Sequence, residues 1–73
     1  MKRYRLETSD ASYELELTRG AYAVLRDVSR RVTASRPQIG DRPLFEVPTD
    51  EWNGRALRVG ALEIGPLVRV KAC

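Results

Sequence analysis

The chain has 73 residues, of which 42% are hydrophobic and 32% are charged, and its formal net charge at pH 7 is +3. It has no histidine and one cysteine, Cys73, which argues against a zinc mechanism, a Ser-His-Asp triad and an internal disulfide. No apolar run suits a membrane span or a signal peptide. We therefore expect one small cytosolic domain, 1–73, that binds a partner without catalysis, metal or cofactor.

Alternation of polar and apolar residues predicts an N-terminal β-hairpin over 3–17. With a four-residue loop, Leu6 would face Leu15, and one face of the hairpin would be apolar throughout. On the other face Glu7 would stand opposite Glu14, which is a repulsive pair. This mismatch predicts that the polar face is exposed to solvent.

The segment 19–34 is predicted to form an amphipathic helix that packs on the apolar face of the hairpin. Its apolar residues follow one another at intervals of 3, 1, 3 and 4 positions, and they are Ala21, Val24, Leu25, Val28 and Val32. Thr18 suits the N-cap position of this helix. Pro37 would end it, because a proline disfavours helical geometry at the preceding residue.

Proline and glycine residues divide the rest of the chain into shorter segments. We expect a loop over 38–43, a short strand over 44–47, and a turn over 50–54, where an Asn-Gly pair tolerates left-handed backbone geometry. Trp52 lies in this acidic turn. As the only tryptophan in a chain with little core material, it is expected to be at least partly buried.

A second hairpin is predicted around a two-residue turn within the sequence Val-Gly-Ala-Leu at 59–62. This turn would place Leu57 opposite Ile64 and Arg58 opposite Glu63. Apolar contacts and an ion pair thus agree on one register.

The elements together predict an α+β fold in a single small domain. An N-terminal hairpin over 3–17 would pack on one amphipathic helix over 19–34, and short antiparallel strands would follow over 44–71. Residues 65–73 leave two alternatives, which are a last strand over 67–71 and a flexible end.

Candidate partner-binding residues lie on the outer face of the predicted helix. They are spaced by 3, 4 and 4 positions, and they are Arg19, Tyr22, Arg26 and Arg30. Such a row would dock on phosphate or on an acidic protein patch; the alternative is a solvated helix face paired with nearby carboxylates. The basic start over 2–5 is a second candidate, with Lys2 and Arg3 as its binding residues, either as a binding arm or as a charged edge strand that blocks aggregation.

Charges of opposite sign occur in separate blocks of the sequence. Residues 19–36 hold five arginines against one aspartate, and residues 41–51 hold four carboxylates against one arginine. Patches of both signs favour a protein partner over a uniform nucleic-acid surface. The alternatives are a nucleic-acid-binding module that uses the arginines, and an inhibitor or antitoxin of a host nuclease whose acidic segment 46–52 mimics a phosphate backbone.

Three stretches of the sequence carry a resemblance to known proteins, and they read YRLETSDASYELEL, TRGAYAVLRDVSRRVTASRP and, at the end, GPLVRVKAC. In length and order they resemble the small phage-encoded transcription regulators that bind host bacterial RNA polymerase. The likeness covers the whole chain but includes no diagnostic motif. The candidate residues above therefore rest on spacing alone.

The resemblance implies a monomeric, non-enzymatic factor in the cytoplasm of an infected bacterium. It would bind RNA polymerase near the RNA exit channel, on the N-terminal end of the largest subunit and the adjacent flap. Such a factor would inhibit sigma-dependent initiation, which shuts off host transcription, and it would also promote antitermination. A host elongation factor and nascent RNA are further partners that the resemblance implies.

Overall fold

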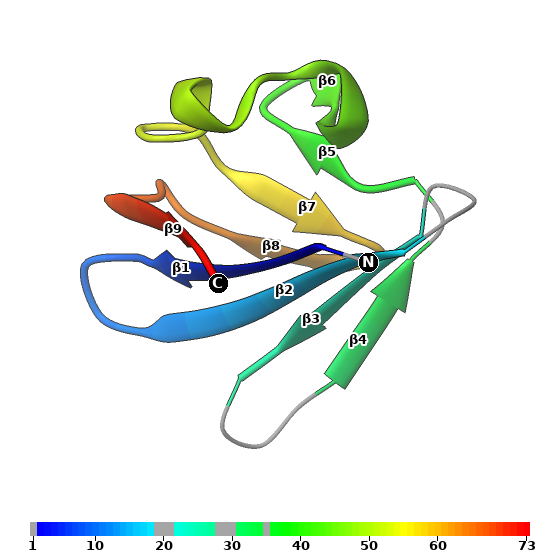
Figure 1. Ribbon diagram of the computed structural model, residues 1–73, viewed down its shortest axis with the longest axis horizontal. Helices are drawn as coiled ribbons and strands as arrows, with labels where there is room; N and C mark the ends of the chain where they lie inside the picture. Colours follow the sequence, from blue (N-terminus) through cyan, green and yellow to red (C-terminus); the bar gives the residue numbers. More distant parts are fainter. Residues whose placement is uncertain (1, 19–21, 28–30, 35) are drawn as a thin grey trace.

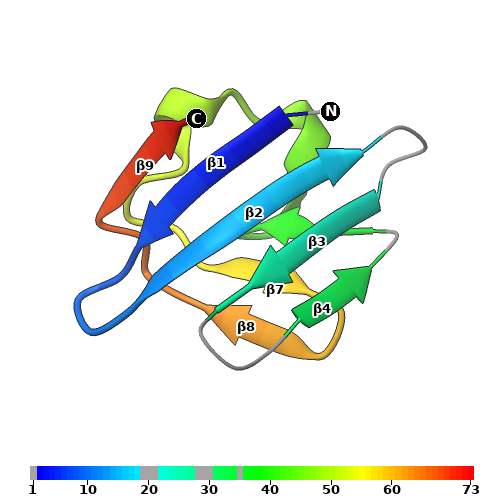
Figure 2. The same cartoon turned by 60° about the horizontal axis from the view of Figure 1, so that its bottom comes forward.

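The computed structural model describes residues 2–18, 22–27, 31–34 and 36–73. In this part of the chain, nine short β-strands form two antiparallel sheets whose apolar faces meet (Figure 1 and Figure 2). The arrangement is that of a small β-sandwich, in which side chains from two facing sheets fill the space between them.

The larger sheet has five strands, which are β1 (Lys2–Glu7), β2 (Ser12–Thr18), β3 (Tyr22–Arg26), β4 (Arg31–Ala34) and β9 (Arg69–Ala72). The smaller sheet has four, which are β5 (Gln38–Ile39), β6 (Arg42–Pro43), β7 (Leu57–Val59) and β8 (Leu62–Ile64). Two 3-10 helices connect β6 to β7, and they are η1 (Leu44–Glu46) and η2 (Thr49–Glu51). The strand orders are β4-β3-β2-β1-β9 and β6-β5-β7-β8. Neither helix of the described residues is long or apolar enough to cross a bilayer.

The N-terminal hairpin forms as predicted, but its register differs from the predicted one by two residues. Arg5 pairs with Glu14, and the Thr8 N–H donates to the Ala11 carbonyl oxygen at 2.9 Å to close the loop. A shift of two residues leaves every side chain on the same face. It also replaces the repulsive pairing of Glu7 with Glu14 by pairs of arginine and glutamate, which is the physical reason for the observed register.

The predicted helix over 19–34 is wrong, and so is the α+β fold class. β3 and β4 occupy this segment; β3 pairs with β2, and β4 pairs with β3. Thr18 is therefore the last residue of a strand and caps no helix. The β-branched residues Val24, Val32 and Thr33 favour strands over helices. Pairing of β3 with β2 also covers a sheet edge that a helix would have left open.

The second predicted hairpin is confirmed, including its register. β7 and β8 pair Val59 with Leu62 and Arg58 with Glu63, and the φ angle of Gly60 in the turn is 62°. The Arg58 Nη2 atom lies 3.4 Å from the Glu63 Oε1 atom. The smaller sheet that contains this hairpin covers the apolar face where the helix was expected.

Several shorter segments differ from the prediction. The expected loop over 38–43 contains β5, a turn and β6, and the expected strand over 44–47 begins with η1. Prolines flank that segment, and a proline has no N–H to extend a strand ladder. The expected turn over 50–54 begins in η2 and ends at Gly54, where φ is 82°. Of the two alternatives for 65–73, the structure has the strand, because β9 pairs with β1.

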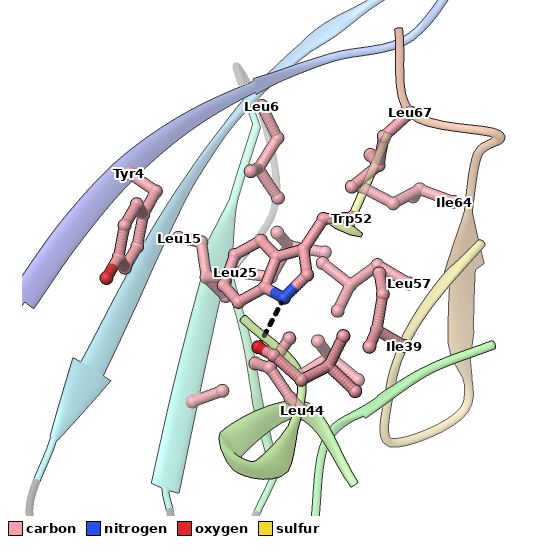
Figure 3. Packing of buried hydrophobic residues seen from close by; sticks show 13 residues of the cluster. Tyr4, Leu6, Leu15, Leu25, Ile39, Leu44, Trp52, Leu57, Ile64 and Leu67 are labelled. Atoms are coloured by element: carbon pink, nitrogen blue, oxygen red, sulfur yellow. Dashed lines mark hydrogen bonds between the residues drawn. The ribbon is translucent and has the colours of Figure 1, made fainter. Parts of the chain in front are cut away.

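Trp52 lies inside the core between the two sheets (Figure 3). Its side chain is 2% exposed, and its indole Nε1–H donates to the Val47 carbonyl oxygen at 3.0 Å. Its ring centroid is 5.3 Å from that of Tyr4. The expected burial of this residue is confirmed. Among the described residues no polar or charged residue is buried, so the charged side chains lie on the surface.

Candidate binding face

The outer face of the larger sheet, which points away from the core, carries a concentration of positive charge. Successive side chains of a strand point to opposite faces, so the residues between buried positions point outward. Six basic residues share this side, and we call them the basic face: Arg3, Arg5, Arg26, Arg31, Arg69 and Lys71. Three carboxylates share it with them, and they are Glu7, Glu14 and Glu16.

Strand pairing aligns five of these charged residues in one row across all five strands. Lys71 pairs with Arg5, Arg5 with Glu14, Glu14 with Arg26, and Arg26 with Arg31. Neighbouring strands lie about 4.8 Å apart, so the row spans roughly 19 Å. It contains four cations and one anion, and the anion occupies the middle position.

Two shallow hollows lie on the basic face, and both are lined by Arg5. The smaller, of about 160 Å³, lies over β1 and β9 and is lined by Arg5, Glu7, Arg69 and Lys71. The larger, of about 380 Å³, is lined by Arg5, Ser12, Tyr13, Glu14, Arg26 and Asp27. Their linings are mainly charged, so they suit the carboxylates or guanidinium groups of a partner better than an apolar ligand.

Among the residues that the structure describes, no ion pair within 4.0 Å holds the cations of the row, although Glu14 lies on the strand between Arg5 and Arg26. Arg3, beside the row, is paired, because its Nε atom lies 3.3 Å from the Glu16 Oε2 atom. In the part of the chain that the structure describes, no carboxylate forms an ion pair with Arg5, Arg26 or Arg31. These guanidinium groups are therefore available to a partner.

Two pairs in the row place like charges directly opposite each other. Arg5 faces Lys71, and Arg26 faces Arg31. Opposed like charges on neighbouring strands destabilise a sheet. Because folding gains nothing from these pairs, their presence favours a role in binding.

The substitution Lys71→Glu is expected to stabilise the fold by about 0.2–1 kcal/mol, because it turns the repulsion with Arg5 into an attraction. Urea unfolding of the variant and the parent, followed by circular dichroism, measures the difference. The substitution Lys71→Gln is the matched control, since it removes the repulsion without adding an attraction, and its gain should be smaller. A variant with Glu that is less stable than the parent would contradict this account.

The predicted row on a helix does not exist in that form, because the segment is not a helix. Of its members, Arg26 ends β3 and belongs to the basic face, and Tyr22 begins β3, where it pairs with Thr18. Arg19 and Arg30 lie outside the described residues. In the structure, strand pairing places Arg26 beside Glu14 and Arg31, which the helical spacing did not predict.

The two predicted residues of the basic start lie on opposite faces of β1, although both line a hollow of about 510 Å³ beside the strand. Arg3 lies on the basic face, whereas Lys2 lines an apolar groove of about 330 Å³ at one end of the sandwich. The groove is bordered by Trp52 and by Phe45, which is 46% exposed. Among the described residues that line the groove, Lys2 is the only charged one, so these residues include no pair of an acid and a base for catalysis.

Three residues of the basic face were not predicted as part of any site, and they are Arg31, Arg69 and Lys71; Arg5 belonged to the basic start but was not among its predicted binding residues. Alternation along the last strand shows that Arg69 and Lys71 share a face. Their proximity to Arg5 depends on pairing between strands from the two ends of the sequence, and no local pattern reveals such pairing.

Acidic residues gather on a different side of the molecule. Four exposed carboxylates lie on η1, η2 and the turn before β6, and they are Asp41, Glu46, Asp50 and Glu51. Figure 1 shows the two 3-10 helices, in yellow-green, beyond the smaller sheet and away from the outer face of β1 to β4. The smaller sheet also carries the exposed Arg42 and Arg58, so the charge on this side is mixed, whereas the outer face of the larger sheet is mainly basic.

Neither a metal-binding cluster among the described residues nor a match to a known protein indicates what this surface binds. The described residues include no cluster of three potential metal-ligating side chains of histidine, cysteine, aspartate or glutamate. Comparisons of the chain with protein-family models, curated proteins and solved structures found no match.

Proposed function

We propose that this chain is a non-enzymatic regulator that binds bacterial RNA polymerase through the basic face. The observation that carries the proposal is the row of four cations and one anion across the larger sheet. Unpaired guanidinium groups in a fixed row complement an acidic protein surface, and Arg recognises carboxylates through forked hydrogen bonds. The resemblance to phage-encoded regulators supplies the identity of the partner.

The position of Glu14 favours a protein partner over nucleic acid. This carboxylate lies in the middle of the row, between Arg5 and Arg26. A phosphate backbone is negative throughout and would be repelled there, whereas a protein surface can place a cation opposite Glu14. Such alternating complementarity increases specificity more than it increases affinity.

By the resemblance, the bound regulator lies near the RNA exit channel, on the N-terminal end of the largest subunit and the flap. Attachment there hinders the contacts of the sigma factor and so inhibits initiation. It also allows the elongating polymerase to pass intrinsic terminators. The regulator needs no catalytic group for either effect, because occupancy of the surface is sufficient.

Isothermal titration calorimetry with purified bacterial RNA polymerase tests this proposal. The double variant Arg5→Glu with Arg26→Glu should bind at least about 30-fold more weakly than the parent, because it reverses two central cations of the row. The control is Arg36→Glu with Arg42→Glu, which changes the net charge equally at exposed positions outside the basic face. Its affinity should stay within about threefold of that of the parent.

Two results would contradict the proposal. One is an equal loss of affinity in both double variants, which would indicate a general effect of net charge. The other is an absence of polymerase binding together with binding of bare DNA or RNA that falls by about 0.7 to 0.9 log units per log unit of salt for each neutralised phosphate. The second result would identify a nucleic-acid-binding module.

A further inference from the structure

β9 forms one edge of the larger sheet. It pairs with β1 on one side, and Figure 2 shows it at the margin of the sheet, in red, with no described strand or helix beyond it. Arg69, Lys71 and Ala72 in this strand are exposed. An open edge of this kind is a template for pairing with another chain.

The direction in which the backbone N–H and C=O groups of β9 point can be derived from the hydrogen bonds between β9 and β1. The Cys73 N–H donates to the Arg3 carbonyl oxygen at 3.0 Å. Bonded and non-bonded pairs alternate along an antiparallel ladder. The N–H and C=O groups of Val70 and Ala72 therefore point away from β1. The free edge offers two donors and two acceptors, in the spacing that an added strand requires.

The charges beside this edge select one kind of strand. Arg69 and Lys71 lie on the basic face of β9, and Arg5 stands next to Lys71 on β1. These cations repel a second copy of β9, which is how edge charges prevent self-association. The same cations attract a strand with carboxylates at alternate positions. Between the carboxylates, apolar residues would lie on the side of Val70, which packs against the core.

We propose that β9 binds an extended acidic segment of a partner protein as a sixth strand of the larger sheet. Main-chain hydrogen bonds then supply affinity, and the alternate carboxylates supply specificity. The opposite edge, β4, has a single cation, Arg31, among its described exposed residues and is less complementary to such a segment. This inference rests on the proposed function only for the identity of the partner, and it adds the conformation of the segment that is bound.

Nuclear magnetic resonance with a capped ten-residue peptide of alternating Glu and Val tests the inference directly. On titration into the ¹⁵N-labelled chain, the amide exchange of Val70 and Ala72 should slow at least tenfold, because their N–H groups become bonded. The amides of Arg69 and Lys71 already face β1 and should change less. A control peptide with two central prolines in place of Val should bind at least tenfold more weakly. Shift changes across the whole basic face without slower exchange at Val70 and Ala72 would overturn the inference.

A matched pair of variants tests the outward N–H group of Val70. Val70→Pro removes this group, and an edge strand tolerates proline where the missing N–H faces solvent. Val70→Ala removes most of the same side chain but keeps the N–H. The proline variant should bind the Glu-Val peptide at least tenfold more weakly than the alanine variant. Equal affinities would overturn the inference, and if the proline variant does not fold, the exchange rates of the parent decide.

The same variants separate this inference from the proposed function. Polymerase binding that is lost with Arg5→Glu and Arg26→Glu but is unchanged by Val70→Pro would support the basic face and overturn strand addition. Peptide binding at Val70 and Ala72 without any binding of polymerase would support strand addition and overturn the choice of partner.

Discussion

Replacement of Trp52 by alanine is expected to lower the free energy of unfolding by about 3–5 kcal/mol, which is the usual cost of truncating a large buried aromatic residue. The indole is 2% exposed, lies against the ring of Tyr4, and donates a hydrogen bond to the Val47 carbonyl oxygen. A domain of this length has a total stability of roughly 4–11 kcal/mol. The variant should therefore be close to unfolding at room temperature. Urea unfolding followed by circular dichroism measures the change, since the variant has no tryptophan fluorescence.

Two further variants separate the cavity from other effects of this substitution. Trp52→Phe also leaves the Val47 carbonyl oxygen without its donor, but it keeps an aromatic ring in the core. Its loss of stability should therefore be smaller than that of Trp52→Ala. Phe45→Ala truncates an aromatic residue that is 46% exposed and should cost about 1 kcal/mol or less. A Trp52→Ala variant within 1 kcal/mol of the parent would contradict the central position of this residue in the core.

Gly65→Ala is expected to destabilise the fold by about 3 kcal/mol, through backbone strain together with overpacking. The φ angle of Gly65 is 132°, which a residue with a side chain rarely adopts. An added Cβ atom would lie 2.8 Å from the Cα atom of Ala56 and 3.0 Å from the carbonyl oxygen of Arg55. Both contacts are with backbone, so no flexible side chain can move aside. Thermal and urea unfolding measure the loss.

Gly54→Ala is the matched control for this prediction. Gly54 also has a positive φ angle, 82°, but an added Cβ atom would meet nothing within 4 Å. This variant should show the backbone cost alone, about 1–2 kcal/mol. Equal losses in the two glycine variants would indicate that the close approach to Ala56 is not a significant constraint.

The local hairpins were predictable because their information lies within a few neighbouring residues. The turn at Gly60 fixes the register of β7 with β8, and the pairing of Arg58 with Glu63 agrees with it. The first hairpin has a longer loop, so two registers keep the same apolar face. Only the charges distinguish them, since the observed register avoids the repulsion between Glu7 and Glu14.

The segment 19–34 was not predictable from its periodicity. Its apolar residues match one face of a helix, yet the β-branched Val24, Val32 and Thr33 and the open edge of β2 favour strands. Tertiary pairing decided the outcome, and periodicity within one segment does not report on a neighbouring edge. The candidate site changed with it, because strand pairing places Arg26 beside Arg31 and not on a helical ridge.

The pairing of β9 with β1 has a consequence for how the larger sheet folds. β1 ends at Glu7, whereas its neighbour β9 begins at Arg69, so this pair joins segments that are far apart in the sequence. Contacts between residues distant in sequence slow folding. During folding, β1 therefore keeps one edge open until β9 docks beside it, and in that interval the open edge is exposed to pairing with other chains.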